Sequence, residues 1–291
     1  MQIIENTDTS TRVAFNSIAD MAAYVAPHGQ QQIPGATNDA LNPSRNSAGA
    51  AESFAQSLQR GHDGGYWPEG AARMKPATLP ADIMADVLPG IPRQEIQEAG
   101  FRPCVPAYLA GSPKAMWRTT PSETPNRLLK IGVNIAAAHY YTPAQLLDRG
   151  AAILSVLDAL QADGYSVELW ACYRVKNDGT GRQMSIETLI KDSTDSWSPD
   201  SVAFALASAG FSRCLNWRVT EILGAVEGMA PARTIDSMSG NGNGLDGPDF
   251  DCWYRYPGAA DQNHWASADS ALTHAVKVAS EQLTAPREVA A

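Results

Sequence analysis

Apolar and polar residues change their periodicity along this chain, and the most regular pattern lies near its middle. Residues 128–136 are almost continuously apolar, which is typical of a buried β-strand. Residues 142–164 carry apolar side chains at helical spacing, from a Thr-Pro pair typical of a helix start to a terminating glycine. Residues 166–175 alternate between apolar and polar positions, which predicts a second strand. Strand, helix and strand together predict a βαβ unit with parallel pairing.

The flanking segments predict further strands and helices around this unit. The expected fold class is α/β, of doubly wound type, with a mainly parallel sheet, flanking helices and a helical, irregular N-terminal extension. We expect an N-terminal region over 1–100 and an α/β core domain over 101–291. The further strands are expected at 183–191 and 252–257, and the further helices at 17–25, 50–59, 199–209, 211–227 and 267–283.

Composition limits the class of protein. With 291 residues, of which 44% are hydrophobic, the chain can bury a sizeable core. No apolar run approaches the roughly 18 residues of a membrane span, and the first residues lack the pattern of a signal peptide. A soluble cytoplasmic protein is expected. The four cysteines form no CxxC pair, so we expect reduced thiols in the core.

Charge is distributed unevenly along the chain. The whole chain has a net charge of −9, which argues against a surface that binds nucleic acid everywhere. Residues 102–130, however, include five basic residues and only one acidic residue. This basic island indicates a localised binding surface. The alternative is that the uneven distribution has no functional meaning.

The end of the first predicted strand carries unusual residues for a ligand site. In an α/β fold this edge commonly binds metals or phosphates. The segment resembles von Willebrand factor A domains, in which a buried strand ends in Asp-x-Ser-x-Ser and holds magnesium. The matching positions here are Asn134, Ala136 and Ala138. The resemblance therefore implies this scaffold without its metal. Close packing of the next helix on small residues is the simpler explanation of the alanines.

Aromatic and basic residues gather around the same unit. His139, Tyr140 and Tyr141 follow the strand end and cannot all be core residues, and residues 108–118 combine aromatic rings with cations. Cations contact a phosphate backbone and exposed rings stack on unpaired bases, so this mixture favours single-stranded over duplex DNA. The candidate nucleic-acid-binding residues are Lys114, Trp117, Arg118, Arg127, Lys130, Tyr140, Tyr141, Arg174, Lys176 and Arg182.

An ordinary ion-paired surface is the alternative for these residues. Asp148, Asp178 and Glu187 lie near enough in the sequence to neutralise part of the set. A solvated, locally paired surface would have the same composition and no ligand.

No catalytic pattern is evident. The glycine-rich run at 240–244 has no preceding strand and no Gly-Lys-Ser/Thr, so it is not a P-loop. Asp246, Asp249 and Asp251 could hold calcium but lack the register of an EF-hand, and a solvated loop fits them better. We expect a non-enzymatic protein without cofactor or metal. A metal-dependent hydrolase at this loop is the third hypothesis.

Three segments carry a resemblance to a known family. Residues 105–118, 130–147 and 150–170 resemble the single-stranded-DNA-binding RNA polymerase cofactor family of enquatro-type podoviruses, over roughly residues 100 to 230. The resemblance implies a protein of the host cytoplasm that brings the phage RNA polymerase to single-stranded template DNA. The expected partners are single-stranded DNA and that polymerase, with no membrane, and self-association into a homo-oligomer is left open. A metal-less von Willebrand A-like interaction or assembly module is the alternative.

Overall fold

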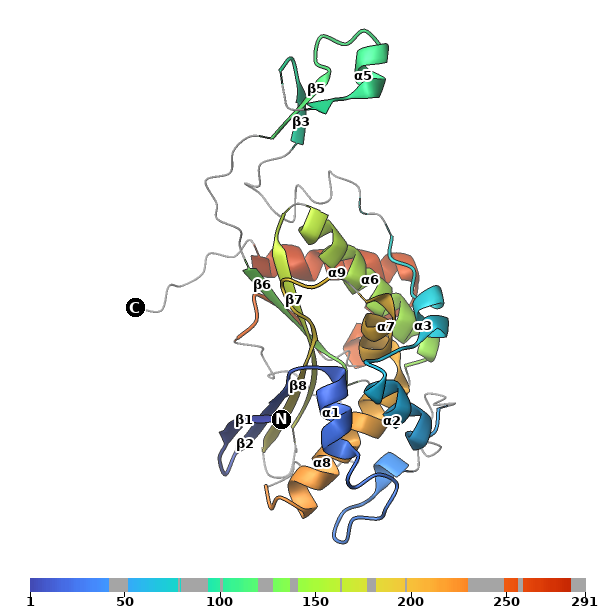
Figure 1. The fold of residues 1–291 in the computed structure, drawn as a ribbon, viewed down its shortest axis with the longest axis vertical. Helices are drawn as coiled ribbons and strands as arrows, with labels where there is room; N and C mark the ends of the chain where they lie inside the picture. The colour runs from blue at the N-terminus through green and yellow to red at the C-terminus, as the bar shows by residue number, and fades with distance from the viewer. Residues whose placement is uncertain are drawn as a thin grey trace, which may run out of the picture.

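A six-stranded sheet lies at the centre of the computed structural model (Figure 1). The structure describes residues 1–41, 52–77, 79, 94–99, 102–119, 128–136, 141–162, 164–176, 182–196, 198–229, 249–255 and 259–283. In spatial order the strands are β1 (Gln2–Asn6), β2 (Ser10–Phe15), β8 (Gln183–Lys191), β7 (Ser166–Lys176), β6 (Leu128–Asn134) and β9 (Cys252–Tyr254).

Parallel pairing predominates in this sheet. β6 pairs in parallel with β7 and with β9, and β2 pairs in parallel with β8. β7 and β8 form an antiparallel hairpin, and β1 is an antiparallel edge strand on β2. α6 (Pro143–Ala162) connects β6 to β7. The predicted α/β class and the predicted parallel βαβ unit are therefore confirmed.

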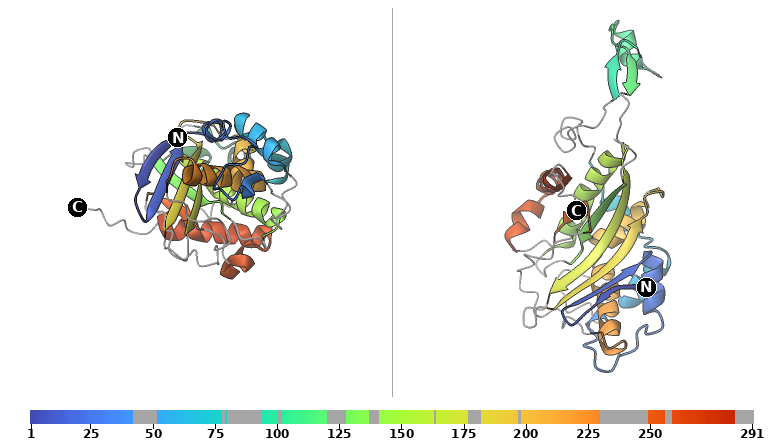
Figure 2. Two further views of the ribbon diagram at one scale, coloured as in Figure 1. Left: turned by 90° about the horizontal axis from the view of Figure 1, so that it is seen from below. Right: turned by 90° about the vertical axis from the view of Figure 1, so that its left-hand side faces the viewer.

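In the described part of the chain, the helices pack on one face of the sheet (Figure 2). Buried side chains that include Val13, Ile131, Leu169 and Ile186 point to this helical layer. The expected doubly wound arrangement, with helices on both faces, is not observed. The layer contains α1 (Ile18–Val25), α2 (Phe54–His62), α3 (Pro68–Arg73), α6, α7 (Pro199–Ala207), α8 (Asn216–Ala225) and α9 (Ala268–Leu283), with the short η1 (Asp39–Leu41), η3 (Gly210–Leu215) and η4 (Ala259–Trp265).

The N-terminal residues belong to the same sheet and core. They were expected to be helical and irregular, but they begin with β1 and β2, and β2 pairs with β8. The alternation that buries Val13 and Phe15 extends over only six residues, and a pattern this short does not distinguish a strand from a loop. The predicted boundary at residue 100 therefore does not coincide with a division of the sheet.

A buried ion pair attaches the N-terminal loop to α8. Arg218 is fully buried and its Nη1 donates to Glu221 Oε2 at 2.8 Å and to Asn38 Oδ1 at 3.1 Å. Its Nη2 donates to the carbonyl oxygen of His28 at 3.2 Å, and the Ala40 N–H donates to Glu221 Oε1 at 3.2 Å. The segment around residues 28–40 is therefore held by charge-assisted hydrogen bonds to one turn of a buried helix.

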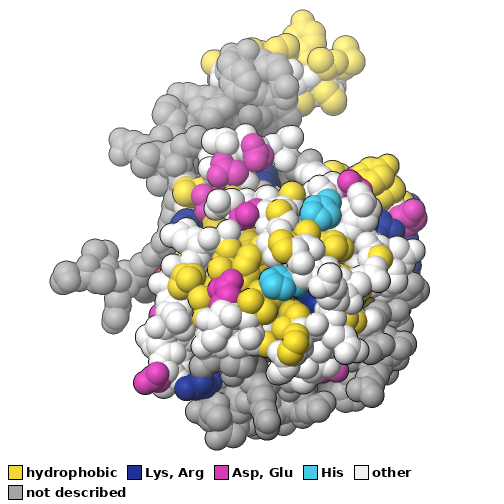
Figure 3. All heavy atoms as spheres, turned by 60° about the horizontal axis from the view of Figure 1, so that its bottom comes forward, with side chains coloured by type: hydrophobic (Ala, Val, Ile, Leu, Met, Phe, Trp, Pro, Cys, Tyr) yellow, Lys and Arg dark blue, Asp and Glu magenta, His cyan; other side chains and the backbone are white. Residues whose placement is uncertain are grey.

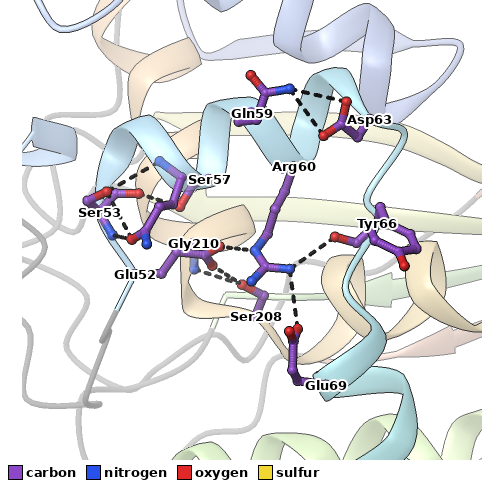
Figure 4. A network of polar contacts seen from close by, with 11 residues as sticks. Glu52, Ser53, Ser57, Gln59, Arg60, Asp63, Tyr66, Glu69, Ser208 and Gly210 are labelled. Carbon is purple, nitrogen blue, oxygen red and sulfur yellow. Dashed lines mark hydrogen bonds and ion pairs between the residues drawn. The ribbon is translucent and has the colours of Figure 1, made fainter.

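A second polar network joins α2 and α3 to the start of η3 (Figure 4). Arg60 pairs with Glu52 and donates to the carbonyl oxygen of Tyr66 at 3.0 Å. Glu52 Oε2 accepts from Ser208 Oγ at 3.2 Å, and Ser208 Oγ accepts from the Gly210 N–H at 3.0 Å. These contacts satisfy polar groups at the break between α7 and the π-helical turn of η3.

A small antiparallel sheet forms a separate unit. β5 (Met116–Thr119) pairs with β3 (Gln94–Gln97) and with β4 (Arg102–Pro103), and Figure 1 shows the unit apart from the six-stranded sheet. α5 (Val105–Leu109) lies between β4 and β5 and buries none of its residues. Val105, Tyr108 and Leu109 are exposed large apolar side chains on this short helix.

Two expectations from composition can be checked against the structure. All four cysteines are buried free thiols, which confirms the predicted reduced core residues. Burial raises the pKa of Cys214 to about 11 and that of Cys252 to about 12, so both remain protonated near neutral pH. Within the described ranges, no helix has the length and apolar character required to cross a bilayer.

We predict that Arg218→Met lowers the free energy of unfolding by roughly 3–5 kcal/mol, because Glu221 would remain buried without its cation. Urea denaturation followed by circular dichroism measures the change. Lys277→Met is the matched control, since Lys277 forms an exposed pair with Glu281 at 3.8 Å and should contribute at most about 1 kcal/mol. Equal effects of the two substitutions would contradict the role of the buried pair.

Candidate nucleic-acid interface

The sheet face opposite the helices is the candidate interface, and we call it the open face. Figure 2 (right) shows the strands in front of the helical layer on this side. Strand residues alternate between the two faces, so each strand that buries an apolar set on the helical side presents its other set here. The open face contains Arg12 of β2, Ser185 and Glu187 of β8, Glu168, Trp170 and Arg174 of β7, Lys130 and Gly132 of β6, and Trp253 of β9.

At the centre of the open face, two arginines share one carboxylate. Arg12 donates from Nε to Glu187 Oε1 at 2.7 Å and from Nη2 to Oε2 at 2.9 Å. Arg174 donates from Nη2 to Oε1 at 2.8 Å and from Nε to Ser185 Oγ at 2.9 Å. Ser185 Oγ in turn donates to Glu187 Oε1 at 2.9 Å. This cluster joins β2, β8 and β7 by side-chain contacts.

The cluster fixes the charge states of its members. Burial by itself would raise the pKa of Glu187, but the hydrogen bonds from Arg12 and Arg174 outweigh burial and lower it below its ordinary value. The hydrogen bond to Glu187 likewise raises the pKa of Arg12. Glu187 is therefore ionised at neutral pH, and the two arginines leave one net positive charge beside it.

Aromatic rings adjoin the cluster. Phe250 stacks on Trp253 with 5.5 Å between ring centroids and 18° between ring planes. The guanidinium carbon of Arg174 lies 4.9 Å from the Trp253 ring centroid and 5.8 Å from that of Phe250, within cation–π range. Both rings lie over Gly132, where an added Cβ would come within 2.6–2.7 Å of them. Glycine at this position therefore allows the rings to lie flat on the sheet.

Residues 249–251 lie against the open face. Asp249 forms an ion pair with Arg12. Asp251 Oδ2 accepts from the Lys130 N–H at 2.6 Å, and the Asp251 N–H donates to the Lys130 carbonyl oxygen at 2.8 Å. Both aspartates therefore contact the sheet, and Asp249 is at the same time exposed to solvent, as expected for a solvated loop. Asp246 and the glycine run at 240–244 lie outside the described residues, within which no His, Cys, Asp and Glu group suits a metal ion.

The carboxyl end of β6 is closed by protein groups. Asn134 is buried, its Nδ2 donates to the Arg174 carbonyl oxygen at 3.3 Å and its Oδ1 accepts from the Ala136 N–H at 3.1 Å. Arg149 Nη2 donates to the carbonyl oxygens of Asn134 at 3.0 Å and of Arg255 at 3.1 Å. A buried guanidinium of α6 therefore supplies positive charge at this edge. Ala138 lies outside the described residues.

The predicted binding residues fall into separate groups. Lys114 is exposed before β5, and Trp117 and Arg118 lie within β5, where they pair with Ile96 and Glu95. These three residues belong to the small sheet and not to the open face. Arg127 and Tyr140 lie outside the described residues, as does His139.

Three other predicted cations belong to the six-stranded sheet. Lys130 is on the open face with a half-exposed side chain, 3.9 Å from Glu168. Lys176 ends β7 opposite Gln183, and Arg182 immediately precedes that residue. The β7–β8 hairpin therefore brings Lys176 and Arg182 to the same end of the sheet.

Two predicted contacts do not fit their positions. Tyr141 is only 2% exposed, so its ring is packed in the core and is not accessible to a base. Arg174 is buried and bonded to Glu187, the residue expected to neutralise part of the basic set. Arg174 supports the aromatic pair, and Tyr141 is no longer a candidate contact.

Sequence analysis missed Arg12, Trp170, Phe250 and Trp253 as site residues. The alternation of residues 10–15 was the available signal for Arg12, because a strand there places the Arg12 side chain on the face that Val13 and Phe15 do not occupy. Trp170 was recognised as a polar-face residue of its strand but was not assigned to the site. Its partly exposed ring donates from Nε1 to Glu168 Oε2 at 3.3 Å.

The side of the molecule drawn in Figure 3 carries a different surface. Hydrophobic, acidic and histidine side chains are interspersed there, and few Lys or Arg side chains are visible. Hydrophobic side chains also gather at the far tip, where the small sheet lies. The described cations on the side shown in Figure 3 form no patch suited to a phosphate backbone.

Fold and site together define an α/β protein with one helical layer and a polar, aromatic open face. The chain belongs to the family described as Domain of unknown function (DUF7192), whose model matches residues 4–248. No curated protein and no solved structure matches the chain. The family description assigns no function, so the proposal below is argued from the residues of the open face.

We predict that Glu187→Gln destabilises the protein at pH 7 by about 3–5 kcal/mol, because two arginines lose their shared carboxylate. Since the folded-state pKa of Glu187 is lowered, its contribution is complete above the ordinary glutamate pKa of about 4.3 and disappears as pH falls through the folded-state value. Urea titrations should therefore show a difference in the free energy of unfolding between wild type and variant. This difference should be constant from pH 7 down to about pH 4 and should narrow between about pH 4 and pH 3.

The control for this prediction is Glu281→Gln, which removes an exposed carboxylate paired only with Lys277 on α9. Its stability should follow that of the wild type within about 1 kcal/mol throughout the titration. A difference for Glu187→Gln that grows as the pH falls would contradict the assigned charge state.

Proposed function

We propose that this protein binds single-stranded DNA along the open face and acts as a cofactor that brings a phage RNA polymerase to single-stranded template. One observation carries the proposal: cations and aromatic rings occupy neighbouring strands of a sheet face that no described helix covers. Exposed sheet faces bind single strands in other proteins, because a sheet presents rings flat to the bases.

The spacing on the open face suits an extended strand of nucleotides. Lys130 lies opposite Glu168, and Lys176 lies eight residues further along β7, or about 26 Å at the usual rise of roughly 3.3 Å per residue. Trp170 and Trp253, on which Phe250 stacks, lie between these two positions. Arg182 lies at the same hairpin end as Lys176. A path of several nucleotides can therefore meet cations at both ends and rings between them.

The geometry favours unpaired bases over duplex DNA. Rings that lie flat on a sheet offer stacking surfaces, which duplex DNA cannot use while its bases are paired. A duplex reader places a helix or a two-stranded ribbon in the major groove. The described helices present no such basic ridge, and their apolar faces are packed against the sheet.

The small sheet offers a second set of contacts. Lys114 and Arg118 are cations of this unit, and Trp117 lies in its central strand. Val105, Tyr108 and Leu109 on α5 have exposures of 58%, 70% and 78%. Large apolar side chains that are this exposed suit a contact with protein more than one with phosphate. We assign the polymerase contact to α5 and its neighbouring cations.

The same helix favours the second candidate function, a protein-interaction or assembly module without DNA binding. α5 would then be the binding element, and the open face would have a structural role only. The two functions differ in one property, because only the first predicts salt-dependent binding of DNA.

We predict that fluorescence anisotropy detects tighter binding to a labelled single strand than to a duplex of the same sequence, with affinity decreasing as salt increases. Lys130→Glu should weaken binding and reduce the salt slope by roughly 0.7 for the lost phosphate contact. Trp170→Ala should cost about 1–3 kcal/mol of binding free energy if its ring stacks on a base.

Lys277→Glu is the matched control, because Lys277 lies on α9 in the helical layer with its side chain 67% exposed. It changes the net charge as Lys130→Glu does but should leave the salt slope unchanged. Equal loss of binding in both variants would show a general charge effect. Absence of binding by the wild type at low salt would favour the interaction module.

A further inference from the structure

We infer that Asp249 and Phe250 occupy the place of one nucleotide on the open face, and that single-stranded DNA must displace them to bind there. This inference rests on the proposed function and adds to it a subsite and an internal competitor. The segment brings a carboxylate to an arginine and a ring to Trp253, an open-face residue that is 4% exposed with the segment in place. These are the two contacts that a nucleotide makes through its phosphate and its base.

The carboxylate of Asp249 occupies a position suited to a phosphate oxygen. Arg12 directs Nε and Nη2 to the two oxygens of Glu187, which leaves Nη1 pointing to Asp249. Asp249 is 53% exposed, whereas Glu187 is 4% exposed. An exposed ion pair contributes little and is readily exchanged, whereas the buried pair persists. Displacement of Asp249 therefore frees one fixed N–H donor group without disturbing the cluster beneath it.

The ring of Phe250 occupies a position suited to a base. It lies nearly parallel to Trp253, and Gly132 leaves the space beneath both rings. The backbone of Trp253 is held in place, because Gln282 of α9 accepts from its backbone N–H at 2.8 Å and donates to its carbonyl oxygen at 3.0 Å. The indole, with the Arg174 guanidinium beside it, remains a stacking surface after Phe250 has moved.

Asp251 provides the anchor about which the segment can move. Its side chain and N–H are both bonded to the backbone of Lys130, at 2.6 Å and 2.8 Å. Asp249 and Phe250, by contrast, hold the open face only through side chains. The chain can therefore leave the face at residues 249 and 250 while β9 stays paired with β6. The occupant that replaces them is one nucleotide, with its phosphate at Arg12 and its base on Trp253.

The test compares Asp249→Asn with Asp63→Asn in the full chain. Asp63 is exposed at the end of α2, where its side chain contacts Gln59, so its substitution changes the net charge equally but lies in the helical layer. We predict that Asp249→Asn binds a labelled oligothymidylate about threefold to tenfold more tightly at low salt, because its competitor no longer pairs with Arg12. The salt slope should match that of the wild type, because both proteins contact the phosphate through Arg12 once the DNA is bound.

The outcomes separate this inference from the function on which it rests. Tighter binding by Asp249→Asn alone would support the competitor. Equal gains in both variants would show a general effect of charge and overturn it. Wild-type binding that Asp249→Asn leaves unchanged would overturn the competitor while the proposed function stands. If neither protein binds the single strand, both the function and the inference fail.

Hydrogen exchange supplies a readout that does not depend on affinity. The N–H groups of Asp249 and Phe250 should gain no protection when saturating oligothymidylate is added, because these two residues leave the face, and the N–H of Asp251 should stay protected by the Lys130 carbonyl oxygen. Peptides from β6 and β7 should exchange more slowly under the same conditions. Slower exchange of residues 249 and 250 on binding would show that they stay in place beneath the DNA, which would overturn the inference.

Discussion

The carboxylate of Glu187 is the group on which the organisation of the sheet depends. It accepts hydrogen bonds from Arg12 and from Arg174, and so it connects the N-terminal hairpin to the central strands through β8. Two guanidinium groups that contact the same carboxylate require its negative charge between them, and a buried carboxylate requires cations that lower its pKa. Each member therefore depends on the other two. The cluster lies on the face of the sheet that no described helix covers, where Asp249 and the aromatic rings of Phe250 and Trp253 pack against its arginines.

Among the described residues, the helices form one layer on the opposite face of the sheet. The alternating side chains of β7 place Leu169, Ala171 and Tyr173 against helices and Trp170 and Arg174 on the other side. The fold then closes its remaining polar edges with protein groups. Gln282 pairs with the backbone of the edge strand β9, and Arg149 bonds the carbonyl oxygens at the end of β6. The strand end that resembles a metal-binding scaffold therefore contains a guanidinium among its own carbonyls.

Much of the local structure could be predicted from the sequence, because it depends on short-range patterns. The βαβ unit, the end of its helix just before Gly164 and the third strand all follow from periodicity and from residues that begin or end helices. The site depends on contacts between distant residues. Arg12 and Glu187 are 175 residues apart, and no local pattern indicates which strand β2 will join. Neither the pairing of Asp249 with Arg12 nor the burial of Tyr141 has a signal in the neighbouring sequence.

The central claim is that the open face is the surface that receives single-stranded DNA. Ultraviolet crosslinking of the full chain to a bromodeoxyuridine-substituted single strand, mapped by mass spectrometry, tests this claim directly, because adducts form at aromatic side chains that stack on bases. The account predicts adducts in β7 at Trp170 and in the segment that contains Phe250 and Trp253. Adducts confined to the helical layer, for instance to Tyr24 or Tyr66, would contradict it.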